Sequence, residues 1–162
     1  MMRVGRAAIV ITASLTLAGA QTAQAACIDP PVAQAARLHE FETLMMDVSL
    51  RCSLAGVAMQ PHYEAMVSSQ QARFDAAAQR LQGFFAIGSE PQARHGGLYD
   101  RYATMIANRY GGGNTSVDSC RLFDAVAVEL SRTRDDGRTL AAVAEAMVRH
   151  PMLERATCPA AR

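Results

Sequence analysis

Apolar side chains recur every three or four positions between residues 31 and 54, and the last of them is a cysteine. This spacing gathers the side chains on one face of an α-helix. Asp29 can cap the start of the helix, and Gly56 suits its end, where a left-handed residue commonly follows. The stretch therefore predicts a long helix that directs the cysteine toward the core. The residues of this stripe are Leu38, Phe41, Met45, Val48 and Cys52.

The same periodicity predicts further helices after residue 56, and strand-like alternation of apolar and polar residues is not evident in the sequence. We therefore predict an all-α fold, an antiparallel bundle of four to five helices joined by short loops and stapled by disulfides. The expected helices run from Pro61 to about Phe85, from Leu98 to about Tyr110, from a capping box at Thr115 and Asp118 to about Leu130, and from Leu140 to near Pro151.

The first 25 residues are typical of a secretory signal peptide. They begin with two arginines and no acid, continue with an apolar stretch shorter than the about 20 residues of a membrane span, and end in small residues. We expect cleavage after Ala25, which leaves 26–162 as a single helical domain without a membrane span; an uncleaved anchor is the alternative. The expected location is the periplasm or the extracellular space.

The charge balance argues against several classes of function. Two of the 16 basic residues lie in the expected signal peptide, so the rest of the chain carries 14 basic residues against 15 acidic ones. Proteins that bind nucleic acid or anionic membranes usually show a basic excess, so we expect neither partner. All 16 basic residues are arginine, which excludes Schiff-base chemistry and phosphate loops that depend on lysine.

Four cysteines in an exported chain most often form two disulfides, and they can pair in three ways. A helix over 31–54 is about 35 Å long, whereas the Cα atoms of a disulfide lie within about 7 Å, so Cys27 cannot reach Cys52. In an up-and-down bundle the first helix ends where the fourth begins, which places Cys52 near Cys120. We predict the disulfides Cys52–Cys120 and Cys27–Cys158. A redox role is the alternative, but the sequence lacks a C-x-x-C motif, and core-facing cysteines tend to be inert.

Several polar side chains could carry chemistry, and each also has a simpler interpretation. His39 and Glu42 could form half of a bundle-type metal site, but the second half is missing, so a polar helix surface is expected. His62 and Glu64 lack the H-E-x-x-H spacing of zinc hydrolases. The acids Glu42, Glu64 and Asp75 could serve a cell-envelope hydrolase, although nothing marks two of them as a pair. We expect neither a metal nor a cofactor.

Three further features have structural interpretations. The glycine run at 111–114 resembles a phosphate loop, but without a preceding strand or a following lysine it is expected to end a helix. The methionines lie mostly on or beside apolar stripes and are expected to fill the core. Gln70 and Asn108 interrupt apolar stretches; they either line a groove for a peptide or lipid or act as satisfied polar residues of the core, and the second role is favoured.

Three stretches, LMMDVSLRCSLAG, HYEAMV and DRYATMIANRYG, resemble a group of small exported helical proteins of Gram-negative bacteria whose function is not known. The resemblance implies an α-helical periplasmic domain with a cystine, and it implies no catalytic residues. The matching residues are Leu44 and Met45, the triplet Leu50-Arg51-Cys52, Tyr63 with Val67, and residues 100–111.

Together these observations favour an exported helical interaction or structural protein whose ligand is an envelope protein, a peptide or a lipid. The alternative is a small cell-envelope hydrolase that uses carboxylates or histidine as acid and base. A water-filled cleft with two converging titratable groups of shifted pKa would favour the enzyme, whereas a shallow apolar groove would favour the binding protein. The sequence leaves the oligomeric state open.

Overall fold

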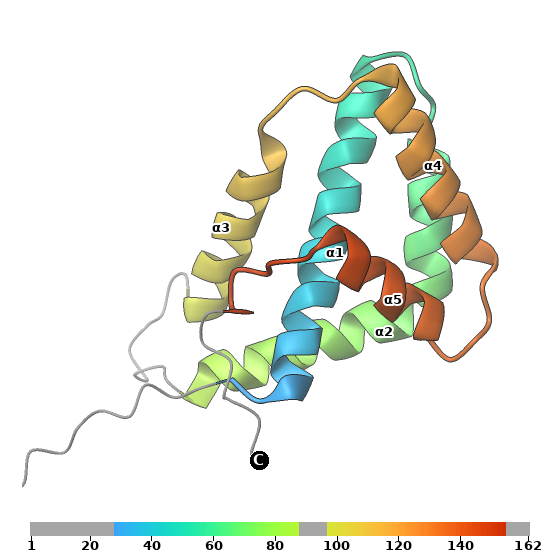
Figure 1. The fold of residues 1–162 in the computed structure, drawn as a ribbon. Helices are drawn as coiled ribbons and strands as arrows, with labels where there is room; N and C mark the ends of the chain where they lie inside the picture. The colour runs from blue at the N-terminus through green and yellow to red at the C-terminus, as the bar shows by residue number, and fades with distance from the viewer. Residues whose placement is uncertain (1–27, 88–96, 155–162) are drawn as a thin grey trace, which may run out of the picture.

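The computed structural model describes residues 28–87 and 97–154, and these residues form five helices and no strand (Figure 1). The predicted signal peptide at 1–25 lies outside the described residues. Helices account for 79% of the described part of the chain, which confirms the predicted all-α class. The helices are α1 (Pro30–Leu54), α2 (Gln60–Ile87), α3 (Leu98–Gly111), α4 (Val117–Arg132) and α5 (Arg138–Met147).

α1 begins and ends where the sequence predicts. The side chain of Asp29 accepts a hydrogen bond from the backbone N–H of Val32 at 3.2 Å, which satisfies one of the free donors of the first turn. After the helix, Gly56 adopts a φ of 79°, a left-handed conformation that glycine reaches without steric cost. These two residues therefore limit α1 to the stretch that carries the apolar stripe.

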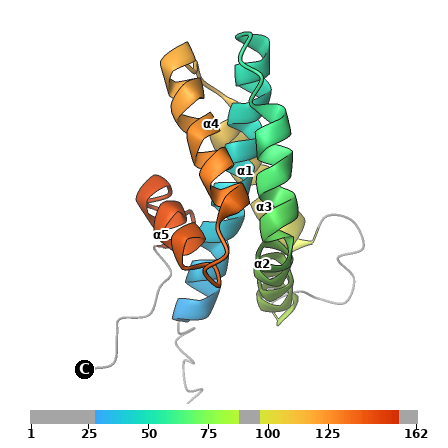
Figure 2. The same ribbon diagram turned by 90° about the vertical axis from the view of Figure 1, so that its right-hand side faces the viewer.

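α1 is the central helix and contacts the other four. α1 and α3 run in one direction and α2 and α4 in the other, which confirms the predicted antiparallel bundle (Figure 1). α3 flanks one side of α1, and α4 with the first half of α2 flanks the other. The second half of α2 crosses behind the N-terminal part of α1 toward α3 (Figure 1). α5 runs obliquely to the bundle and packs on α1 (Figure 2). None of the described helices is both long and apolar enough to cross a bilayer.

Two apolar clusters stabilise this arrangement, and α1 and α2 take part in both. The first cluster joins the C-terminal half of α1 to α2, α4 and α5, and it buries Phe41, Met45, Val48 and Cys52 from the predicted stripe. The second cluster joins the N-terminal half of α1 to the end of α2 and to α3. Its buried members include Ala36, Leu81, Tyr102 and Ile106.

The predicted disulfide between Cys52 and Cys120 is present. The two Cα atoms lie 5.5 Å apart, and both side chains are fully buried in the first cluster. The bond joins the last turn of α1 to the first turns of α4, where the alternating helix directions bring these ends together. The second predicted pair, Cys27–Cys158, lies outside the described residues.

The start of α4 differs from the prediction. The cap is Ser116, whose side chain accepts a hydrogen bond from the N–H of Ser119 at 3.1 Å, so the predicted capping box at Thr115 and Asp118 is wrong. Thr115 is engaged elsewhere, because its hydroxyl accepts a hydrogen bond from Arg51 Nε at 2.9 Å. The tertiary contact with α1 thus decides which of two adjacent hydroxyls caps the helix.

Gln70 is a satisfied polar residue of the core, as favoured from the sequence. Its side chain is buried, and Nε2 donates to the backbone oxygen of Leu130 at 2.8 Å, which links α2 to the end of α4. Asn108 is exposed on α3, so the core interpretation is wrong for that residue. The glycine run follows α3, which ends at Gly111, and this confirms its predicted role as a helix end.

Candidate functional site

A buried carboxylate, Glu40, lies midway between α3 and the C-terminal segment that follows α5. Oε1 accepts hydrogen bonds from the hydroxyl of Tyr102 at 3.3 Å and from the N–H of Met152 at 2.5 Å. Oε2 accepts one from the hydroxyl of Tyr110 at 3.0 Å and lies 3.7 Å from Arg109 Nη1. Four groups from two distant parts of the chain therefore meet on one side chain of α1.

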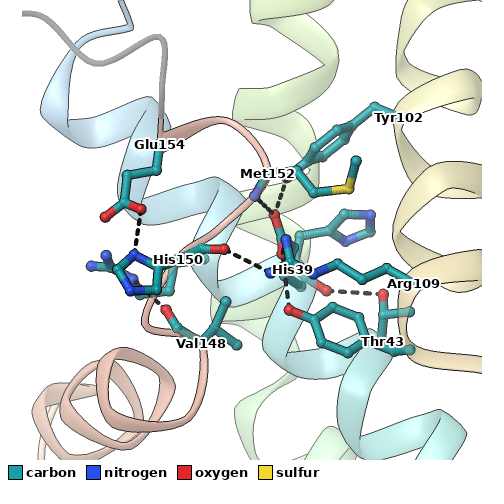
Figure 3. A network of polar contacts seen from close by, with 11 residues as sticks. His39, Thr43, Tyr102, Arg109, Val148, His150, Met152 and Glu154 are labelled. Atoms are coloured by element: carbon teal, nitrogen blue, oxygen red, sulfur yellow. Dashed lines mark hydrogen bonds and ion pairs between the residues drawn. The ribbon is translucent and has the colours of Figure 1, made fainter. Parts of the chain in front are cut away.

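The segment 148–152 is bound to α1 and α3 through its main chain (Figure 3). Arg37 Nε donates to the oxygen of Val148 at 3.1 Å, and Arg109 Nη2 donates to the oxygen of His150 at 3.0 Å. The N–H of Met152 completes the series by donating to the carboxylate described above. These contacts fall on every second residue and attach the segment to both helices.

The surroundings of Glu40 indicate a structural role. Burial raises the pKa of its carboxyl group, while the hydrogen bonds from Met152 and Tyr110 and the charge of Arg109 oppose that shift. The same carboxylate and burial raise the pKa of Tyr110 to about 12. Because the Glu40 side chain is fully buried, a substrate cannot reach it.

His39 lies against aromatic rings and its side chain is only 16% exposed, so the predicted polar helix surface is wrong at this position. Its ring lies 5.7 Å from the ring of Tyr99 and 6.2 Å from that of Tyr102, measured between centroids. Both ring nitrogens are buried without a hydrogen-bond partner, and burial lowers the pKa of the imidazole. The α3 aromatic residues cover this part of α1, a contact that periodicity within α1 cannot reveal.

The buried His39 gives a testable pH dependence. Replacement of His39 by phenylalanine is expected to leave the free energy of unfolding unchanged or higher at about pH 7.5, because the ring contacts remain and two unpaired nitrogens disappear. Below pH 6.5, the ordinary pKa of histidine, the unfolded wild-type chain binds more protons than the folded one, so only the wild type loses stability through this residue.

Urea denaturation of the wild type and H39F at several pH values between about 5 and 7.5 measures the difference. Glu42 lies 4.0 Å from the imidazole, so the difference reports the imidazole together with its effect on Glu42. Parallel pH dependences would show that His39 is not buried as described.

Glu42 is one of the three acids considered for a hydrolase, and the fold shifts its pKa. Its Oε2 lies 4.0 Å from His39 Nδ1, and both burial and the nearby charge of Asp75 raise the pKa of its carboxyl group. Burial and the charge of Glu42 also raise the pKa of Tyr63 to about 12. The structure thus brings Glu42 and Asp75 together, which the sequence could not indicate.

The other sequence candidates are separate from this pair. His62 Nδ1 lies 2.7 Å from an oxygen of Asp124, so it links α2 to α4 at the surface. Glu64 accepts a hydrogen bond from Gln60 at 3.0 Å on the exposed side of α2. Within residues 28–87 and 97–154, no group of three or more histidine, cysteine, aspartate or glutamate side chains is arranged to hold a metal ion.

An open pocket of about 640 Å³ lies along α3, and we call it the α3 groove. Its polar lining residues are Asp100, Arg101 and Thr104 on α3. The sequence does not indicate this site. Its walls come from the end of α2, from α3 and from the C-terminal segment, and these parts of the chain come together only when it folds. The apolar lining residues are Phe85, Leu98, Tyr102, Met105 and Leu153.

The α3 groove exposes apolar surface that a folded chain usually buries. Leu98 is 41% exposed and Met105 is 50% exposed, although the same helix buries Tyr102 and Ile106 completely. Small-molecule sites are typically concave, mostly apolar and about 300–1,000 Å³ in volume, and the groove fits that description. His39, Glu42 and Asp75 do not line it.

Comparison of the chain with protein-family models, with curated proteins and with solved structures found no match. The fold and the site therefore define the class of protein by themselves. It is a small helical protein with a buried disulfide, a structural carboxylate at its centre and an open apolar groove along α3.

Proposed function

We propose that this chain is an exported helical binding protein that holds an apolar ligand in the α3 groove. The observation that carries the proposal is the groove itself, a volume of about 640 Å³ with exposed Leu98 and Met105 on its wall. Burial of these side chains under a ligand would be favourable, because it removes apolar surface from water. This gain supports the proposed binding function.

Two observations support export. The disulfide between Cys52 and Cys120 is of the kind that persists in oxidising compartments such as the periplasm. The first 25 residues have the composition of a signal peptide. An exported protein that binds apolar molecules would meet lipids and apolar segments of envelope proteins, which agrees with the partner classes expected from the sequence.

A hydrolase is the second candidate, and the approach of Asp75 to Glu42 favours it. The pKa of Glu42 is raised by burial and by the nearby Asp75, and a carboxyl group with a raised pKa beside a second carboxyl group is a usual arrangement for a general acid. However, Glu42 is only 27% exposed in its side chain, and the α3 groove contains neither acid. We therefore favour the binding function over the hydrolase.

Titration with an environment-sensitive apolar dye, N-phenyl-1-naphthylamine, tests the binding function. We expect the dye to bind the folded, oxidised protein, and we expect Met105→Glu to weaken that binding at least about tenfold, because the substitution places a charge on the apolar wall. The dye's fluorescence gives the dissociation constant, and chemical denaturation checks that the variant is folded.

Leu54→Glu is the matched control. Leu54 lies at the end of α1, away from the groove, and is 91% exposed, so it reports dye that binds any exposed apolar side chain. Equal losses in the two variants, or no binding to the folded wild type, would contradict the proposed function.

A further inference from the structure

Arg101 has an unusual position among the arginines near α3. Arg109 pairs with Glu40, Arg51 donates to Thr115 and to the backbone oxygen of Tyr110, and Arg37 donates to Val148. The guanidinium group of Arg101, by contrast, makes no hydrogen bond or ion pair with any residue in the part of the chain that the structure describes. It lines the α3 groove with its N–H donors unused by the described residues.

Asp100 lines the same groove, but it does not use the N–H donors of Arg101. Asp100 lies in the first turn of α3, where a carboxylate interacts favourably with the positive end of the helix. No ion pair joins it to Arg101 among the described residues, although the two are adjacent in the chain. The groove therefore presents an apolar wall with a carboxylate and a guanidinium group at its edge, and only the guanidinium group can pair with an anion.

We propose that the ligand of the α3 groove is a single-chain anionic amphiphile of the fatty-acid kind. Its hydrocarbon chain lies on Phe85, Leu98 and Met105, and its carboxylate pairs with Arg101 through the planar, bidentate geometry that guanidinium groups favour. The inference rests on the proposed binding function and adds the chemical class of the ligand. It also gives the guanidinium group of Arg101 an ion-pair partner, which the described residues do not supply.

Competition of three ligands with the dye tests this class. Dodecanoic acid, dodecan-1-ol and dodecylamine share one chain length and differ only in the polar end, and each is used below the concentration at which it aggregates. We expect the acid to bind about tenfold more tightly than the alcohol, since a charge-assisted hydrogen bond at a partly exposed site supplies about that factor. The amine is expected to bind most weakly.

Variants of Arg101 assign the preference to this residue. Arg101→Gln is expected to reduce the affinity for the acid to that for the alcohol and to leave the alcohol unaffected. Arg101→Lys should retain part of the preference, because the charge remains. Arg132→Gln, which removes an arginine from the last turn of α4, is the matched control and should bind all three ligands as the wild type does.

The outcomes separate this inference from the proposed function. If none of the three ligands displaces the dye, both are wrong. If acid and alcohol bind equally and Arg101→Gln changes neither, the apolar groove remains and the ligand class is wrong. Preference for the amine, or binding to vesicles of an anionic phospholipid without binding to the monomeric acid, would also overturn the inference.

Discussion

A variant in which both Cys52 and Cys120 are replaced by alanine is expected to have a free energy of unfolding about 4 kcal/mol below that of the oxidised wild type. The disulfide joins residues 68 positions apart, so its loss frees a large loop in the unfolded chain. A loss of this size is a large part of the about 5–15 kcal/mol that stabilises a typical domain. Urea denaturation of both proteins under non-reducing conditions measures the difference.

The single variant Cys52→Ala provides the control for this pairing. It is expected to leave Cys120 as a buried thiol that a maleimide labels only when the chain unfolds, because the site is fully buried in the first cluster. Labelling at Cys27 or Cys158 instead would show that the connection between α1 and α4 is wrong. A double variant as stable as the wild type would show that the bond adds nothing to stability.

Replacement of Glu40 by alanine is expected to lower the free energy of unfolding by about 3 kcal/mol or more. The change leaves the N–H of Met152 and the hydroxyls of Tyr102 and Tyr110 without their acceptor, and it leaves Arg109 without its carboxylate. For a chain of this length, the corresponding fall in melting temperature is roughly 10 °C. Differential scanning calorimetry of the two proteins measures it.

The variant Glu40→Gln distinguishes the effect of the negative charge of Glu40 from the effect of its hydrogen-bond acceptors. The amide keeps one acceptor oxygen, so its cost at neutral pH is expected to be smaller than that of alanine. Burial raises the pKa of Glu40 in the folded protein above its ordinary value of 4.5, so the wild type loses stability relative to this variant as the pH rises above that value. Equal stability of wild type and Glu40→Ala would show that the network does not hold the C-terminal segment.

The helices and the disulfide could be predicted from the sequence, because both depend on regular spacing. The stripe on α1 fixes which face is buried, and the alternating helix directions then place Cys52 beside Cys120. Local capping was less predictable: Thr115 and Ser116 are chemically equivalent caps, and only the contact between Thr115 and Arg51 decides between them.

The polar network and the groove could not be predicted, because their partners are distant in the chain. Glu40 meets tyrosines 62 and 70 positions away and an N–H 112 positions away. Nothing in the sequence around Glu40 distinguishes it from an exposed glutamate, since helical spacing alone gives it no partner. Leu98 lies one helical turn before Tyr102, so the spacing predicts that both are buried. In the folded chain Tyr102 is buried, whereas Leu98 stays 41% exposed and lines the α3 groove.

The attachment of segment 148–152 has a consequence for how freely its sequence can change. Arg37 and Arg109 bind its carbonyl oxygens, and Glu40 binds one of its N–H groups, so the recognition involves atoms that almost every amino acid possesses. Substitutions at the exposed positions Arg149 and His150 would therefore preserve the course of the segment, whereas packing also constrains the buried side chains of Val148 and Pro151. Proline at position 152 would break the series, because proline lacks the N–H that the carboxylate binds.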